Sequence, residues 1–130
     1  MSRVPVSEHE RRCLRQAGVR QADLAHIEPS ELHGVTGMAI ALERCEHIVA
    51  SARLQTLGSV GPSLADDLIR LGIRKVEDLV HRDPRRMWEE LNRKTGTRHD
   101  PCVEYVFRCA VAQARDPELA ADKRQWWSWK

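Results

Sequence analysis

Three Asp-Pro pairs punctuate the second half of the chain, at Asp83-Pro84, Asp100-Pro101 and Asp116-Pro117. An Asp side chain accepts hydrogen bonds from the unpaired amides at the start of a helix, and Pro suits the first helical position because it carries no amide hydrogen. The pairs therefore predict helices near residues 84–94, 101–115 and 117–124. Because alternating runs of β-branched residues are missing from the sequence, an all-α fold with short connections is expected.

Two further helices are predicted in the first half. Ser7 and Glu10 have the spacing of a capping box, in which each side chain accepts a hydrogen bond from the other residue's amide. That helix should end at Gly18, since glycine readily takes the left-handed conformation that stops a helix. A second helix is predicted from about Met38 to Ala52, where apolar residues recur at helical spacing.

A weak internal repeat relates Leu14–Pro29 to Leu68–Pro84 once a gap of one residue is allowed. In both segments the end of a predicted helix is followed by a glycine that ends it, an apolar residue, a short helix and a helix that starts with Pro. The identical pairs are Leu14/Leu68, Gly18/Gly72, Arg20/Arg74, Asp23/Asp78, Leu24/Leu79, His26/His81 and Pro29/Pro84. The similarity has two interpretations, a duplicated unit or a chance likeness between two helix-stop-helix segments.

The stretch Leu54–Ile73, LQTLGSVGPSLADDLIRLGI, joins two predicted helices through a turn rich in small residues. Glycine lets a ligand approach the backbone closely, and Pro62 opens a helix whose first amides are unpaired. Such amides, at the positive end of the helix dipole, form a site suited to a phosphate group. The alternative is that the turn is only an economical connection between helices.

The segment Ser59–Ala65 resembles the helix-hairpin-helix family of DNA-binding motifs, whose pattern is apolar, Gly, apolar, Gly, three residues and Ala. The resemblance implies sequence-independent contact with the DNA phosphate backbone. Ser59 departs from the pattern because it stands at the first glycine, and Asp66 and Asp67 place negative charge near the turn. The residues expected to contact DNA are Ser59, Val60, Gly61, Ser63, Leu64, Arg70, Arg74 and Lys75.

A longer resemblance covers Leu54–Lys130 and is similar to a bacterial helix-hairpin-helix family described as pathogenicity-locus or mitomycin-resistance proteins. It rests on Gly-Ile-Arg followed by Val-Glu-Asp-Leu, on HDPCVEYVFRCAV, and on the closing WWSWK. Residues 1–53 are interpreted as an additional helical module, a degenerate helix-hairpin-helix unit with its own glycine hairpin at His33–Ala41. The expected architecture is therefore a compact domain with tandem helix-hairpin-helix-like units, divided into 1–53 and 54–130.

Two functions of different classes follow. The first is sequence-independent DNA binding, accessory to DNA repair or related transactions; this last step comes from the resemblance alone. With 21 Lys and Arg against 19 Asp and Glu, the net charge is only +2, so DNA contact must use a local patch or main-chain amides. The second is a helical adaptor that binds a protein. Its contact would be the helical surface or the terminal Trp126, Trp127 and Trp129, unless these rings anchor the carboxyl terminus.

A third hypothesis, enzymatic chemistry at Cys102, is weaker. A thiol near a helix start can be reactive, and His99, Cys102 and Cys109 could contribute to a metal site. Packing of both cysteines as small apolar residues is the preferred interpretation. No catalytic residue, metal or cofactor is expected. The amino terminus lacks a signal-peptide pattern and no apolar run reaches the ~20 residues of a membrane span, so a cytoplasmic protein without membrane contact is expected.

Overall fold

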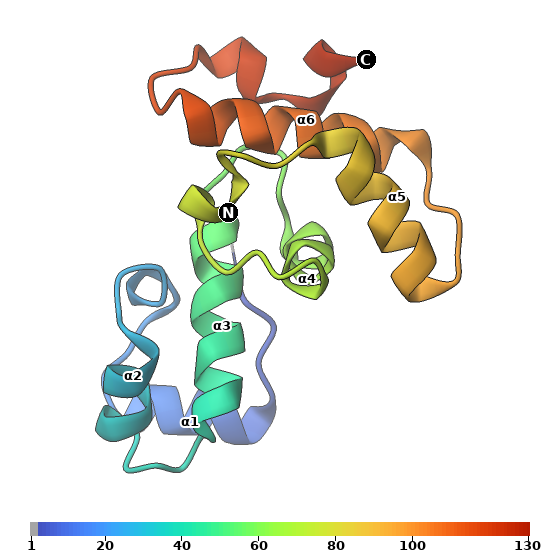
Figure 1. Cartoon of the computed structure of the whole chain (residues 1–130). Helices are drawn as coiled ribbons and strands as arrows, with labels where there is room; N and C mark the ends of the chain where they lie inside the picture. Colours follow the sequence, from blue (N-terminus) through green and yellow to red (C-terminus); the bar gives the residue numbers. More distant parts are fainter. Residues whose placement is uncertain (1–2) are drawn as a thin grey trace.

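A computed structural model describes residues 3–130, and this part of the chain consists of helices and turns without a strand (Figure 1). The expectation of an all-α fold is confirmed. In chain order the elements are α1 (Glu8–Gln16), the 3₁₀ helix η1 (Gln21–Asp23), α2 (Pro29–Val35), α3 (Leu42–Leu54), α4 (Pro62–Arg70), the 3₁₀ helix η2 (Val76–Leu79), α5 (Pro84–Thr95), α6 (Pro101–Arg115) and the 3₁₀ helices η3 (Ala121–Arg124) and η4 (Trp126–Trp129).

The start of α1 is the predicted capping box. The Glu10 amide donates to Ser7 Oγ over 3.1 Å, and the Ser7 amide donates to Glu10 Oε1 over 2.9 Å. The helix ends at Gln16, and Gly18 follows with a left-handed φ of +72°. Both predicted ends of this helix are confirmed.

The predicted start of the next long helix at Met38 is wrong, because α3 begins at Leu42. Gly37 and Met38 both have a left-handed φ, +65° and +63°, and the Met38 amide donates to the His33 carbonyl over 2.9 Å. This arrangement ends α2 and turns the chain, so Met38 belongs to a connection and its side chain is 70% exposed. Helical spacing alone could not reveal the turn, since Met38 is apolar and fits the periodic pattern.

Two of the three Asp-Pro pairs start α-helices as predicted, at Pro84 and Pro101. The helix predicted over 117–124 is wrong. Asp116 Oδ1 accepts the amide of Glu118 over 3.1 Å, but the chain then turns and forms only the short η3. A cap satisfies amides at a helix start, but it does not supply the apolar face that a longer helix needs for packing.

The helices surround two hydrophobic cores, and α3 contributes to both. The first core lies among α1, α2 and α3, and the second among α4, α5 and α6. Along α3, Ala52 belongs to the first core and Leu54 to the second. Figure 1 shows α3 running from the lower lobe into the upper one. The predicted division between 1–53 and 54–130 therefore falls inside the continuous helix α3, and the division into two modules stays a prediction.

The sequence repeat corresponds to a repeat of local structure. The Val19 amide donates to the Leu14 carbonyl over 2.9 Å, as the Ile73 amide does to the Leu68 carbonyl over 3.0 Å. Gly18 and Gly72 are both left-handed. The next turns also match, since a carboxylate accepts a backbone amide in each, from Arg20 to Asp23 (2.8 Å) and from Arg74 to Asp78 (2.9 Å).

The correspondence continues beyond the segment that the sequence repeat covers. Thr36 Oγ1 donates to the Leu32 carbonyl over 2.8 Å, and Thr95 Oγ1 donates to the Leu91 carbonyl over 2.9 Å. A left-handed glycine follows each threonine, Gly37 and Gly96. The order α1-η1-α2-α3 is therefore repeated by α4-η2-α5-α6, with α2 having 7 residues and α5 having 12. None of the helices between residues 3 and 130 is long and apolar enough to cross a bilayer.

Candidate nucleic-acid interface at the start of α4

The turn between α3 and α4 consists of a covered first half and an open second half. Its covered half begins at Gly58, whose amide donates to Gln113 Oε1 over 2.8 Å while its carbonyl accepts from Gln113 Nε2 over 3.0 Å. A Cβ at Gly58 would lie 2.5 Å from the Arg124 carbonyl oxygen. Glycine is required here because α6 and the carboxyl-terminal tail pack directly on the backbone.

Ser59, which replaces the first glycine of the family pattern, has a left-handed φ of +69°. Its hydroxyl donates to the Arg124 carbonyl over 3.1 Å and accepts the Trp126 amide over 3.0 Å. A left-handed conformation costs a non-glycine residue about 1–2 kcal/mol. Two hydrogen bonds to the tail offset that cost and explain how serine is tolerated where glycine would suit the backbone better.

The open half begins at Gly61, the N-cap of α4, which has no side-chain cap. Its φ of −94° is one that any residue can adopt, and a Cβ there would meet nothing within 4 Å. Neither backbone strain nor packing therefore requires glycine at this position. What glycine provides is unobstructed access to the main chain.

Three amides at this helix start, those of Gly61, Ser63 and Leu64, have no acceptor among residues 3–130. Pro62 occupies the first helical position and has no amide hydrogen. Ser63 is exposed. Unpaired amides at the positive end of a helix are suited to an anion such as a phosphate.

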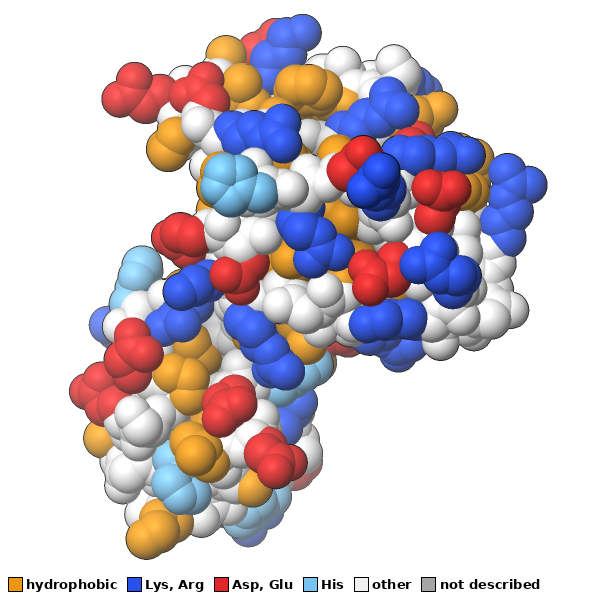
Figure 2. Space-filling model, in the orientation of Figure 1, with side chains coloured by type: hydrophobic (Ala, Val, Ile, Leu, Met, Phe, Trp, Pro, Cys, Tyr) orange, Lys and Arg blue, Asp and Glu red, His pale blue; other side chains and the backbone are white. Residues whose placement is uncertain are grey.

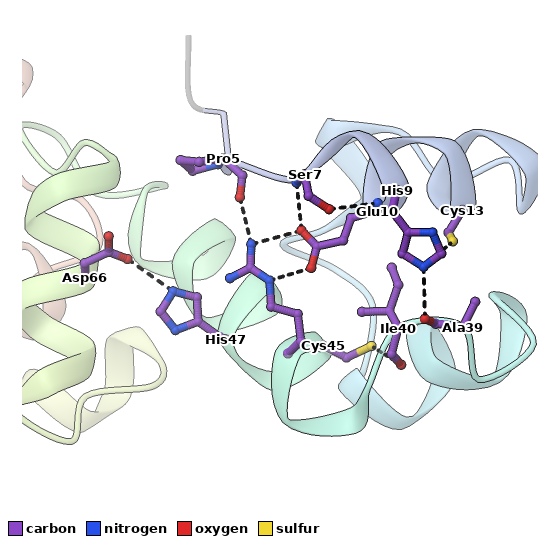
Figure 3. A network of polar contacts seen from close by, with 11 residues as sticks. Pro5, Ser7, His9, Glu10, Cys13, Ala39, Ile40, Cys45, His47 and Asp66 are labelled. Atoms are coloured by element: carbon purple, nitrogen blue, oxygen red, sulfur yellow. Dashed lines mark hydrogen bonds and ion pairs between the residues drawn. The ribbon is translucent and has the colours of Figure 1, made fainter.

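The two neighbouring carboxylates differ in environment. Asp66 is exposed, and its Oδ1 lies 3.2 Å from His47 Nε2 of α3 (Figure 3). Asp67 is half-buried, and burial raises the pKa of its carboxyl group above the ordinary value. The histidine contact gives the Asp66 carboxylate a partner within the protein, but negative charge remains one turn from the open amides.

The predicted basic residues do not surround the open amides. Arg70 ends α4, about 12 Å along the helix axis from Pro62 at a rise of about 1.5 Å per residue. Arg74 is exposed in the following turn, and Lys75 lines an open pocket that also includes Arg53 of α3. The structure thus separates the eight predicted contact residues into a covered pair, Ser59 and Val60; an open group, Gly61, Ser63 and Leu64; and a distant basic group, Arg70, Arg74 and Lys75.

Two features of this region were missed by the sequence reasoning. The first is the cover on Gly58 and Ser59, which comes from Gln113 and the tail and has no local sequence signal. The second is Lys94 of α5, whose Nζ donates to the Arg70 carbonyl over 3.0 Å and so brings a second cation to the far end of α4. Figure 2 shows Lys and Arg side chains gathered over the upper lobe, interleaved with Asp and Glu.

The terminal tryptophans have different surroundings. Trp126 packs partly buried against the second core, and the Lys130 ammonium lies 5.3 Å from its ring centre. Trp129 Nε1 donates to the Lys123 carbonyl over 2.7 Å. Trp127 meets Trp126 edge-on at 6.0 Å and is 56% exposed. Trp126 therefore anchors the tail, while Trp127 is available for contact.

The cysteines and histidine considered for chemistry are not brought together. A hydrogen bond with Asp100 is the main cause that raises the pKa of the Cys102 thiol, and a raised pKa disfavours the reactive thiolate considered for this residue. Cys109 is buried, and burial raises the pKa of its thiol. The His99 ring contacts Asn92 Oδ1 over 2.9 Å. Within residues 3–130 no group of three or more His, Cys, Asp or Glu side chains is arranged to hold a metal ion.

Comparison with known proteins identifies a family for most of the chain. The model of the family Cdd1, described as pathogenicity locus, matches residues 47–130. The mitomycin resistance protein McrB of Streptomyces lavendulae is 36% identical over 74 residues, which are 57% of this chain and 67% of that protein. No solved structure matches the chain significantly. The matched region begins inside α3 and contains the hairpin, the second core and the tail.

Proposed function

The chain belongs to the Cdd1 pathogenicity-locus family, and from that premise we propose that it binds DNA through phosphates at the start of α4. The observation that carries the proposal is the set of unpaired, uncapped amides at Gly61, Ser63 and Leu64. A phosphate oxygen is the acceptor that these amides lack, and the glycine leaves room for it to approach. Contacts of this kind carry no base information, so binding is independent of sequence.

Arg70 and Lys94 provide a second contact at the far end of α4. Lys94 Nζ donates to the backbone carbonyl of Arg70, so both residues lie at this end of the helix. With the open amides, they would engage about two or three phosphates, so the logarithm of the affinity should fall with the logarithm of salt concentration with a slope of about −2 to −3. The small net charge of +2 fits a local contact of this size.

The biological setting of the proposal comes from the family. We propose a non-catalytic accessory in DNA repair or a related DNA transaction, located in the cytoplasm. The name of the relative from Streptomyces lavendulae links that protein to mitomycin resistance, and the same link is proposed for this chain.

The test is fluorescence anisotropy with labelled duplex and branched DNA at several salt concentrations, using Gly61→Glu and Gly34→Glu. A Cβ meets nothing within 4 Å at either glycine, so both variants should fold and both change the net charge equally. Gly61→Glu should weaken binding at least tenfold, whereas Gly34→Glu, on α2, should weaken it less than twofold. Equal affinities for the two variants would rule out the amide contact.

A second candidate function, a protein-binding adaptor, is favoured by the exposure of Trp127. Large aromatic side chains are common anchors of protein interfaces. This ring projects from an anchored tail, so its position is set before a partner arrives. Binding that is lost in Trp127→Ala and that varies little with salt would support the adaptor, because apolar docking depends weakly on ionic strength.

A further inference from the structure

A groove outside the candidate nucleic-acid interface runs along α1. Its floor is apolar and consists of Val6, Leu14 and Val19. Its rim is basic, formed mainly by Arg11, Arg15 and Arg20. The groove lies in the first unit, in a region that the match to the Cdd1 family does not cover.

The rim carries more positive charge than its own carboxylates neutralise. Arg11 pairs with Glu8 over 3.3 Å and Arg20 with Asp23 over 3.7 Å, and most of these side chains are widely exposed. Exposed pairs of this kind contribute little and exchange readily for other partners. Arg15 has no carboxylate within 4.0 Å among the described residues.

The repeat indicates what kind of element fits the side of α1 that carries Arg11 and Arg15. At the register of 54 residues set by Leu14/Leu68, Gly18/Gly72 and Arg20/Arg74, the counterparts of Arg11 and Arg15 on α4 are Ala65 and Ile69. Ala65 is fully buried, and Ile69 packs half-buried against the second core.

The helix α3 is in contact with α4, and its His47 reaches Asp66 (Figure 3). Asp66 follows Ala65 directly in the sequence and lies about one turn from Ile69. In the second unit α3 therefore lies beside this side of α4. In the first unit, residues 3–7 precede α1 without forming a helix, so no element of the described chain takes the corresponding place.

We propose that the groove on α1 binds an amphipathic acidic helix of a partner protein. The helix would take the place that α3 takes on α4. Its apolar residues would contact Val6, Leu14 and Val19, and its Glu or Asp residues would pair with Arg11 and Arg15. Duplex DNA fits less well, because a phosphate backbone offers nothing apolar to cover the floor.

The probe is a fluorescein-labelled designed helical peptide of 18 residues with a Leu stripe flanked by Glu, and its Glu→Gln counterpart is the matched probe. Anisotropy with the full chain should show binding of the Glu peptide and at least tenfold weaker binding of the Gln peptide. Arg11→Glu/Arg15→Glu should weaken binding of the Glu peptide at least tenfold. Arg86→Glu/Arg93→Glu changes exposed residues of α5 by the same charge and should leave binding within twofold.

Several outcomes would overturn the proposal. Absence of peptide binding to the unchanged chain would do so, as would equal losses in the two double variants, which would indicate diffuse charge attraction. Sedimentation showing a dimer that Arg11→Glu/Arg15→Glu dissociates would assign the groove to a second copy. Loss of duplex DNA binding in that variant, without loss of peptide binding, would assign it to nucleic acid. Because Gly61→Glu should leave peptide binding unchanged, failure at the groove is distinguishable from failure at the hairpin.

Discussion

The starts of α1 and α4 occupy equivalent positions in the repeat but treat their amides in opposite ways. At α1, Ser7 and Glu10 accept each other's amides, and Arg44 of α3 binds the Glu10 carboxylate over 2.7 Å (Figure 3). At α4, the counterparts are Gly61 and Leu64, whose side chains cannot accept a hydrogen bond. The same local fold therefore gives one closed helix start and one that is open to an anion.

The largest effect is expected where the turn before α4 is covered. Gly58→Ala places a Cβ against the Arg124 carbonyl and should lower the free energy of unfolding by about 1–3 kcal/mol, because the tail must shift. Urea unfolding followed by Trp fluorescence measures the change. Gly34→Ala, at an open helical position, is the control and should raise stability by about 0.5–1 kcal/mol. Equal stability of Gly58→Ala and the unchanged chain would show that the tail does not hold this half of the turn.

A side-chain cap at the start of α4 should remove the difference between its open amides and the capped amides of α1. Gly61→Ser adds a side-chain acceptor for the open amides without adding charge. DNA binding should weaken several-fold, while the free energy of unfolding should stay the same or rise by a few tenths, about 0.2–0.5 kcal/mol. Anisotropy and thermal unfolding of one preparation give both values. Unchanged DNA affinity in a variant whose helix is capped would separate the amides from binding.

Opening the start of α1 should cost stability. Ser7→Ala removes the acceptor of the Glu10 amide and should lower the free energy of unfolding by about 1 kcal/mol. Ser63→Ala, in the first turn of α4, removes a hydroxyl that makes no hydrogen bond within the described residues, and should change stability by less than about 0.5 kcal/mol. If Ser7→Ala and Ser63→Ala lower the free energy of unfolding equally, the starts of α1 and α4 are not as different as their hydrogen bonds indicate.

The smallest effects on stability are expected from a change of pH. Ionisation of Glu10 in the first unit and of Asp67 in the second should change the stability of the fold in opposite directions. The hydrogen bond from Arg44 holds the pKa of Glu10 below its usual value, so the ionised carboxylate stabilises the fold. That stability is complete above the pKa of the unfolded chain and is lost as pH falls through the folded pKa. Burial raises the pKa of Asp67, so its ionisation opposes folding above the folded pKa, and this penalty disappears in acid.

Glu10→Gln should therefore lower the melting temperature at pH 7, and Asp67→Asn should raise it, each by about 3 °C or less. Both differences should vanish as the pH falls below the pKa values of the carboxyl groups. Calorimetric scans between pH 3 and pH 7, at roughly one-unit steps, follow the two trends. Parallel curves for the two variants would contradict the opposite environments of these side chains.

Most helix boundaries could be predicted because their signals act over a few residues. The Ser7 capping box, the left-handed Gly18 and Gly72, and the helices that start at Pro84 and Pro101 depend on contacts within about four positions. Predictions failed where a local signal was incomplete. The turn at Met38 carries an apolar residue, and the cap at Asp116 precedes a segment without a face to bury.

The candidate site stays a prediction, and the structure distributes its residues over separate parts of the hairpin and α4. Sequence spacing identified the helix start at Gly61, but grouped it with Ser59, Arg70, Arg74 and Lys75. Ser59 instead holds the tail, and Arg70 lies at the other end of α4. Side chains of one segment point in several directions, so closeness in sequence did not imply a shared surface.

By itself the sequence determined most of the helix starts and their caps, because hydrogen bonds of the first turns join residues three or four positions apart. Only the tertiary structure decided which half of the hairpin is covered and which is open. The Trp126 amide binds Ser59 across 67 positions, and Gln113 binds Gly58 across 55. Contacts at such separations depend on how α6 and the tail pack on the second core, and no local pattern specifies that packing.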